Sequence, residues 1–149
     1  MSEYEPVMDR ATHARRLSLL RWILAFSVLS TALHFTHNFI AIDDYPDDLV
    51  SGALVQAAIL VAWPLLTAIG LLGYRLYAQG RLPAAHACLL TYSFLGISTL
   101  GHFLDGSPDI PAFWFATIFT DALAGAAVLA FAISSMRRYS LPTAAASSR

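Results

Sequence analysis

Four long stretches of this chain carry almost no charge, and they constrain its fold more than any other feature. No Asp, Glu, Lys or Arg occurs in residues 22–42, 49–74 or 82–104, and Asp121 is the one charged residue in 110–136. Each stretch reaches the ~20 apolar residues that a helix needs to cross a bilayer. We therefore expect an all-α, polytopic integral membrane protein, an up-down bundle of four transmembrane helices.

Composition agrees with this class and leaves no room for a separate soluble domain. Apolar residues make up 57% of the 149 residues and charged residues only 13%, whereas ordinary soluble domains carry roughly a quarter charged residues. A disordered chain and a secreted, cytosolic or nucleic-acid-binding globule are excluded on these grounds. The single cysteine, Cys88, excludes redox chemistry of the paired-cysteine kind.

The charge pattern also predicts where each span begins and ends. We expect spans at Trp22–Ile42, Val50–Leu72, Pro83–Phe103 and Ala112–Met136. The chain then divides into a cytoplasmic N-terminal segment (residues 1–21), a four-helix transmembrane domain (22–138) and a disordered cytoplasmic tail (139–149). The middle connection is expected to be a loop over Gly73–Leu82, and the other two connections are short and rich in Asp and Pro.

The arginines predict the orientation of the bundle in the membrane. All nine basic residues are Arg, and each precedes the first span, follows the fourth, or lies between the second and third. The positive-inside rule then places both termini and the middle connection in the cytoplasm. The outer connections carry only acidic charges, at Asp43, Asp44, Asp47, Asp48, Asp105 and Asp109. Arginine without lysine indicates a GC-rich coding sequence, so we expect a multi-pass protein of a bacterial inner membrane.

Polar residues inside the expected spans follow helical spacing. In the first span they are three or four residues apart, which places them on one face: Ser27, Ser30, Thr31, His34, His37 and Asn38. The third span carries His102 and leads to Asp105, the fourth carries Thr117 and Asp121, and the second carries Gln56. With a rise of 1.5 Å per residue, His34 and Asp121 each lie roughly 12–13 Å below the outer boundary. If these faces turn inward, they form one polar site in the outer half of the bundle.

The residue types in this site favour acid–base or metal chemistry. We expect His34 and Asp121 to be catalytic, because ionisable residues deep in a membrane are costly and usually functional. His34, His37, His102 and Asp121 are candidate ligands of a divalent metal, with zinc the first candidate. Supporting polar roles are expected for Asn38, Gln56, Asp105 and Thr117. The alternative for each residue is a hydrogen bond that merely links helices.

Several functions remain open at this point. The first is an intramembrane enzyme, a hydrolase or isomerase that acts on a lipophilic small molecule entering between the helices. The second is metal-ion or proton binding and transport, since six outer aspartates would raise the local cation concentration. A haem b protein ranks behind these, because haem propionates prefer basic partners and the outer face has only Asp. A structural subunit of a membrane complex or a homo-oligomer is also compatible with the sequence, and the lipid bilayer is the expected surrounding partner.

Overall fold

Four helices make up the computed structural model of this chain, which describes residues 10–42, 52–104, 106–107 and 109–140. They are α1 (Arg10–Ile40), α2 (Gly52–Ala78), α3 (Leu82–Ser98) and α4 (Ala112–Ser140), and α3 continues into a short 3-10 helix, η2 (Thr99–Phe103). All four are long and apolar enough to cross a membrane. The predicted all-α, four-helix architecture is therefore confirmed, while the side of the membrane that each end faces stays a prediction.

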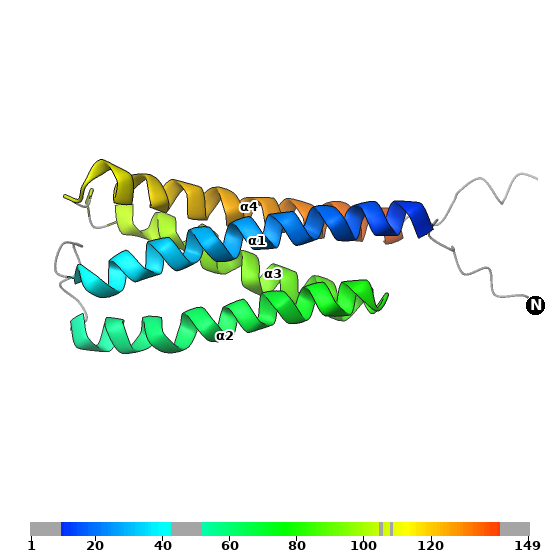
Figure 1. The fold of residues 1–149 in the computed structure, drawn as a ribbon, viewed down its shortest axis with the longest axis horizontal. Coiled ribbons are helices and arrows are strands. Elements are labelled where there is room, and N and C mark those ends of the chain that lie inside the picture. The colour runs from blue at the N-terminus through cyan, green and yellow to red at the C-terminus, as the bar shows by residue number, and fades with distance from the viewer. Residues whose placement is uncertain (1–9, 43–51, 105, 108, 141–149) are drawn as a thin grey trace, which may run out of the picture.

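The helices lie side by side along one long axis, and α1 begins at the end of the bundle where α4 finishes (Figure 1). A hydrogen bond from Arg16 Nη2 to Ser134 Oγ, 2.9 Å long, joins α1 to α4 there. We call this the terminal end, and the opposite end, where α1 finishes at Ile40 and α2 begins at Gly52, the distal end. The acidic segment 43–51, Asp105 and residues 141–149, where a loop and a disordered tail were expected, lie outside the described residues.

Three of the expected span boundaries differ from the helix ends by four residues or more. Helix α1 already begins at Arg10, twelve residues before the expected start of the first span at Trp22. Helix α2 continues to Ala78, so the loop predicted over Gly73–Leu82 is wrong for most of its length. Packing extends α2, because Tyr77 is fully buried and a Cβ on Gly73 would lie 3.1 Å from the Leu89 side chain of α3. Helix α4 likewise runs to Ser140, four residues beyond the expected end of the fourth span at Met136.

A glycine ends α2 and reverses the chain into α3. Gly80 has φ of +73°, a conformation that side chains with a Cβ rarely adopt. The backbone N–H of Arg81 donates to the Leu76 carbonyl, and the N–H of Gly80 donates to the Tyr77 carbonyl. These two bonds form a Schellman motif, which satisfies the last carbonyls of the helix.

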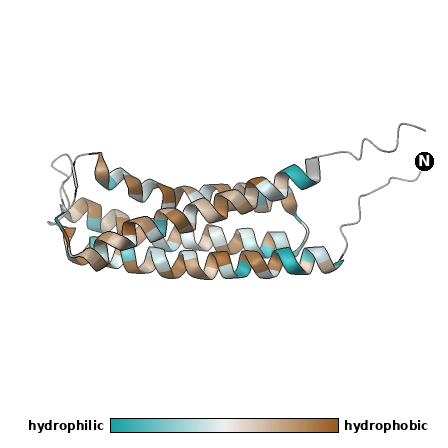
Figure 2. Cartoon of the chain, turned by 90° about the horizontal axis from the view of Figure 1, so that it is seen from above, coloured by the Kyte–Doolittle hydropathy of each residue, from teal (hydrophilic) through white to brown (hydrophobic). Residues whose placement is uncertain are grey.

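The exposed surface of the bundle is apolar, which suits contact with lipid rather than water. Figure 2 shows hydrophobic residues along most of the length of the helices, with strongly hydrophilic residues clearest near the terminal end. Large apolar side chains are exposed on every helix, among them Trp22, Leu29, Leu54, Val61, Phe94 and Leu123. Many of the buried positions are instead polar, a distribution that reflects the low cost of apolar groups and the high cost of polar groups in hydrocarbon.

Helices α3 and α4 approach each other closely where two glycines meet. A Cβ on Gly96 would lie 2.5 Å from the Asp121 backbone oxygen, and a Cβ on Gly125 would lie 2.7 Å from the Ser93 oxygen. Small residues allow this kind of approach between membrane helices. The contact fixes the position of α4 at the level of Asp121, where the candidate site lies.

Candidate functional site

One face of α1 carries a continuous polar stripe that is turned into the bundle. The structure buries every residue of the stripe that the spacing placed on this face: Ser27, Ser30, Thr31, His34, His37 and Asn38. Thr117 and Asp121 of α4 are buried opposite the stripe. His34 and Asp121 have no exposed surface at all. The inward orientation expected from the sequence is therefore present for both candidate catalytic residues.

The α1 stripe meets α4 in successive polar pairs. Thr31 Oγ1 lies 2.6 Å from Asp121 Oδ1, and His34 Nδ1 lies 3.4 Å from Thr117 Oγ1. Ser30 Oγ donates to Thr120 Oγ1 over 3.0 Å at the edge of the same interface. The Thr31 and His34 pairs are separated by about one helical turn, or roughly 5 Å along the axis.

The Thr31 hydroxyl sits between two oxygens that both accept hydrogen bonds. Its Oγ1 lies 2.7 Å from the Ser27 carbonyl oxygen, in addition to its contact with Asp121. A hydroxyl carries only one hydrogen, and a backbone carbonyl carries none. Both short contacts are therefore hydrogen bonds at the same time only when the Asp121 carboxyl is protonated. The carboxyl then donates to Thr31 Oγ1, and Thr31 donates to the Ser27 carbonyl. The other carboxyl oxygen of Asp121, Oδ2, is buried and has no hydrogen-bond partner among the described residues.

The amide of Asn38 lies between two imidazoles. Its Nδ2 is 3.2 Å from Nε2 of His34 and 3.2 Å from Nε2 of His102, which η2 carries. The two rings lie 5.2 Å apart between centroids. His34 lies one turn before Asn38 on α1, and His102 reaches it from the end of the third span, so the group joins two helices near the distal end.

The hydrogen bonds around His34 select one tautomer. Thr117 Oγ1 donates its hydrogen to the Trp114 carbonyl over 2.6 Å, so it can only accept from His34. Nδ1 of His34 therefore carries the ring hydrogen, which leaves Nε2 as an acceptor for one N–H of Asn38. The second N–H of Asn38 then points to His102, whose Nε2 also accepts. The carbonyl oxygen of Asn38 is buried without a partner among the described residues.

The remaining predicted site residues lie apart from this group. His37 stacks on Trp114, with ring centroids 4.6 Å apart. Gln56 donates to the Phe39 carbonyl over 2.8 Å, so it links α2 to α1 at the distal end. Asp105 is outside the described residues. His37 and Gln56 therefore have local partners of their own, and neither is a member of the His34–Asn38–His102 group.

The predicted metal ligands do not assemble into a metal site in the described part of the chain. There, no three His, Cys, Asp or Glu side chains are grouped so that they could hold a metal ion. The contacts explain this: Asn38 stands between His34 and His102, and Asp121 is engaged with Thr31 about one turn deeper. Both Nε2 atoms are directed at the amide, whereas metal ligation needs a free imidazole nitrogen.

The sequence did not single out Thr31 or Tyr92 as site residues. Tyr92 of α3 is buried, and its hydroxyl accepts a hydrogen bond of 3.2 Å from Ser27. The helical spacing of the α1 stripe already contained Thr31, one turn before His34. No sequence signal marked Tyr92, because its role depends on how α3 is turned toward α1.

A second polar group lies near the terminal end. Arg16 Nε donates to the Tyr77 hydroxyl over 3.2 Å, and Ser135 Oγ lies 3.5 Å from the same hydroxyl. His86 Nε2 is 2.9 Å from Ser135 Oγ. The sequence analysis did not predict this group, because Tyr77 was expected in the loop Gly73–Leu82.

Comparisons of the chain with protein-family models, with curated proteins and with solved structures found no match.

Proposed function

We propose that this protein binds and transfers protons inside the membrane, at an acid–base site formed by Asp121, Thr31, His34 and His102. The observation that carries this proposal is the Thr31 hydroxyl, which lies within 2.7 Å of both the Ser27 carbonyl and Asp121 Oδ1. Such a site offers a proton a defined place, because the proton completes a hydrogen-bond chain from the carboxyl through the hydroxyl to the carbonyl.

Release of that proton leaves the site with a different set of hydrogen bonds. The hydroxyl of Thr31 then turns its hydrogen to the Asp121 carboxylate, and its bond to the Ser27 carbonyl is lost. Rotation of one hydroxyl thus accompanies each gain or loss of a proton. This rotation needs no movement of the α1 or α4 backbone. Gly96 and Gly125 hold α3 against α4 at the same level.

Protons reach this site from the distal end in our proposal. His102 is half-buried on η2, whereas His34 is fully buried, so His102 is the entry group. His34 accepts a proton on Nε2 and keeps its Nδ1–H on Thr117, so it holds the proton as an imidazolium and gives it up again from Nε2. Because the Asn38 amide occupies both Nε2 atoms, it must swing aside before His34 takes a proton there. Asn38 is therefore a positioning residue and a gate.

An apolar layer separates the site from the polar group at the terminal end. Leu24 of α1, Leu89 of α3 and Val128 of α4 are all buried there. Beyond this layer lie Tyr77 and its partners Arg16 and Ser135. Two polar groups with an apolar barrier between them favour controlled proton movement over an open channel, because charge crosses such a layer at high cost.

A specific observation also favours a second candidate, an acid–base enzyme for a lipophilic substrate. A pocket of about 230 Å³ opens between α1 and α4, and Thr117 and Ser30 line it among mainly apolar residues. Thr117 is the hydrogen-bond partner of His34, so a molecule in this pocket would lie one side chain away from the imidazole. If His34→Ala loses turnover of a lipophilic substrate but keeps its proton uptake, the enzyme is favoured over proton transfer.

Proton flux into liposomes tests the proposed function. The purified protein is reconstituted around a trapped pH-sensitive dye, and a potassium gradient with valinomycin drives proton entry. We expect flux in the wild type and a fall to the level of empty liposomes in Asp121→Asn. Asp109→Asn is the matched control, because Asp109 is exposed and lies outside the polar site. Equal flux in Asp121→Asn and wild type would contradict the proposal.

A further inference from the structure

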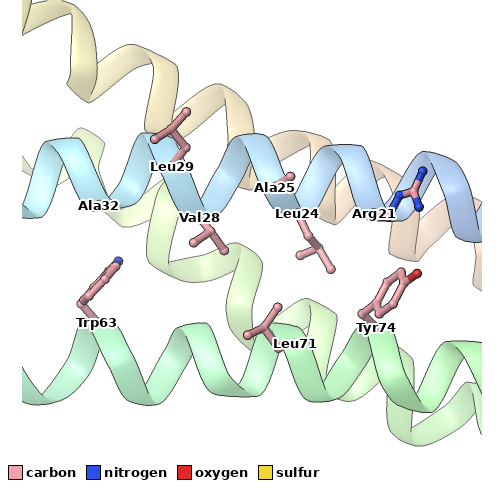
Figure 3. Close-up of a pocket in the computed structure, with 9 residues that line it drawn as sticks. All are labelled: Arg21, Leu24, Ala25, Val28, Leu29, Ala32, Trp63, Leu71 and Tyr74. Carbon is pink, nitrogen blue, oxygen red and sulfur yellow. The ribbon is translucent and has the colours of Figure 1, made fainter.

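A long groove runs between α1 and α2 on the side of α1 that faces away from the polar stripe. It consists of two adjoining cavities of about 500 Å³ and 450 Å³, and both are lined by Ala32 and Trp63. Figure 3 shows the half near the terminal end, where Trp63, Leu71 and Tyr74 of α2 project toward α1. Trp63 lies where the two cavities join.

The groove exists because α3 crosses the bundle obliquely. Gly73 brings α2 against Leu89 of α3 toward the terminal end. Toward the distal end the chain packs on α4 instead, where Thr99 of η2 donates to the Ile118 carbonyl over 3.2 Å. Figure 1 shows the same shift of α3 from the side of α2 to that of α4. The small side chains of Ala25 and Ala32 leave additional space on the α1 wall.

The walls are apolar, but the mouth of the groove at the terminal end is not. Leu24, Val28 and Leu71 form the sides, and Arg21 and Tyr74 stand at the terminal end of the same cavity. A guanidinium and a phenol hydroxyl are both donors suited to a phosphate. The acidic residues within the described ranges are Asp109 and Asp121, and both belong to the distal half, so no described carboxylate neutralises Arg21.

The first of the two cavities, from Arg21 to Ala32, matches one leaflet of a bilayer in length. Ala32 comes eleven residues after Arg21 on α1, a rise of about 16.5 Å at 1.5 Å per residue. Half of a hydrocarbon core that is ~30 Å thick is about 15 Å. A chain that starts at Arg21 therefore ends near Trp63, at mid-membrane.

We propose that this groove binds one anionic phospholipid from the leaflet at the terminal end. Its phosphate lies at Arg21 and Tyr74, and an acyl chain extends past Val28 and Ala32 to Trp63. Basic pockets between transmembrane helices bind anionic headgroups in this manner. The site shares no residue with the proton site, so either proposal can fail without the other.

Native mass spectrometry of the detergent-solubilised full chain tests the headgroup contact. Phosphatidylglycerol and phosphatidylcholine with identical acyl chains are titrated separately. We expect the wild type to prefer phosphatidylglycerol, and Arg21→Gln to bind it about tenfold less tightly, the effect of losing one charge-assisted hydrogen bond. Arg75→Gln is the matched control, because Arg75 is exposed at the same end but does not line the groove. Equal losses in the two variants, or no preference for phosphatidylglycerol, would overturn the proposal.

Two further variants test the chain contact. Ala32→Phe fills the groove where the cavities join, so we expect weaker binding of both lipids with no change in their ratio. Trp63→Phe should leave binding unchanged, because a saturated acyl chain has no acceptor for the indole N–H. That N–H is buried and has no partner among the described residues. Loss of binding in Trp63→Phe would therefore assign the groove to an amphiphile with a polar group at mid-chain, against our proposal.

Discussion

Thr31 of α1 and Asp121 of α4 face each other across the bundle, with 2.6 Å between the hydroxyl oxygen and the nearer carboxyl oxygen. Both residues are almost completely buried. Burying an ionisable group at such a depth costs much solvation free energy. Among the described residues, the hydrogen-bond partner of Asp121 is the Thr31 hydroxyl, which also donates to the Ser27 carbonyl. This shared hydroxyl makes the protonation of Asp121 and the hydrogen bonding of α1 interdependent.

Replacement of Thr31 should destabilise the bundle more than replacement of a similar threonine. Thr31→Val removes the described partner of Asp121, and a buried polar group left unsatisfied costs about 1–3 kcal/mol. Thr36→Val is the control, because the Thr36 hydroxyl bonds only to the Ala32 carbonyl of its own helix and is exposed. Reversible unfolding in mixed micelles gives both free energies of unfolding. Equal losses in the two variants would show that the Thr31–Asp121 contact adds no stability.

Histidine tautomers provide a test of the Asn38 arrangement. We expect nitrogen NMR of ¹⁵N-histidine-labelled protein to show His34 as the neutral Nδ1–H tautomer, because Thr117 accepts from Nδ1 and Asn38 donates to Nε2. Asn38→Leu removes that donor and should change the chemical shifts of the Nε2 atoms in both His34 and His102. His86, whose Nε2 contacts Ser135 near the terminal end, is the internal control. An Nε2–H tautomer at His34 would contradict the assigned hydrogen bonds.

Close contact between α3 and α4 predicts a strong effect of small side chains at two glycines. A methyl group on Gly125 would meet the Ser93 oxygen at 2.7 Å, and one on Gly96 would meet the Asp121 oxygen at 2.5 Å. Both neighbours are backbone atoms, so the helices must separate. We expect Gly125→Ala to lower the free energy of unfolding by about 1–3 kcal/mol. Gly101→Ala, which has open space around it, should be near neutral, and a similar loss there would remove the steric explanation.

Much of the fold follows from the chain's distribution of charge. The four long stretches with at most one charged residue predicted four helices, and the three- and four-residue spacing from Ser27 to Asn38 predicted which face of α1 is buried. Both features are local consequences of helix geometry and of the cost of polar groups in hydrocarbon. The extension of α2 through Tyr77 did not follow, because Tyr74 and Arg75 resemble residues at a membrane interface. Because Tyr77 is buried against other helices, α2 continues through this segment.

The sequence predicted where in the bundle the candidate site lies better than it predicted which side chains contact one another there. Depth along the helices placed His34 and Asp121 in the same half of the bundle, but depth carries no information on rotation or tilt between helices. The oblique path of α3 and the 3-10 turns that carry His102 bring this ring to Asn38. For the same reason the predicted metal ligands share a region of the bundle and do not share one centre.

Infrared difference spectroscopy of the reconstituted protein across a pH titration tests the central claim most directly. A protonated carboxylic acid has a carbonyl stretch separate from the carboxylate bands. Among the bands of the chain's ten Asp and Glu residues, we predict one that is absent in Asp121→Asn, retained in Asp109→Asn and shifted in Thr31→Val, where the hydroxyl partner is lost. An Asp121→Asn spectrum that keeps every titrating carbonyl band of the wild type would contradict the assignment of Asp121 as the proton-binding group.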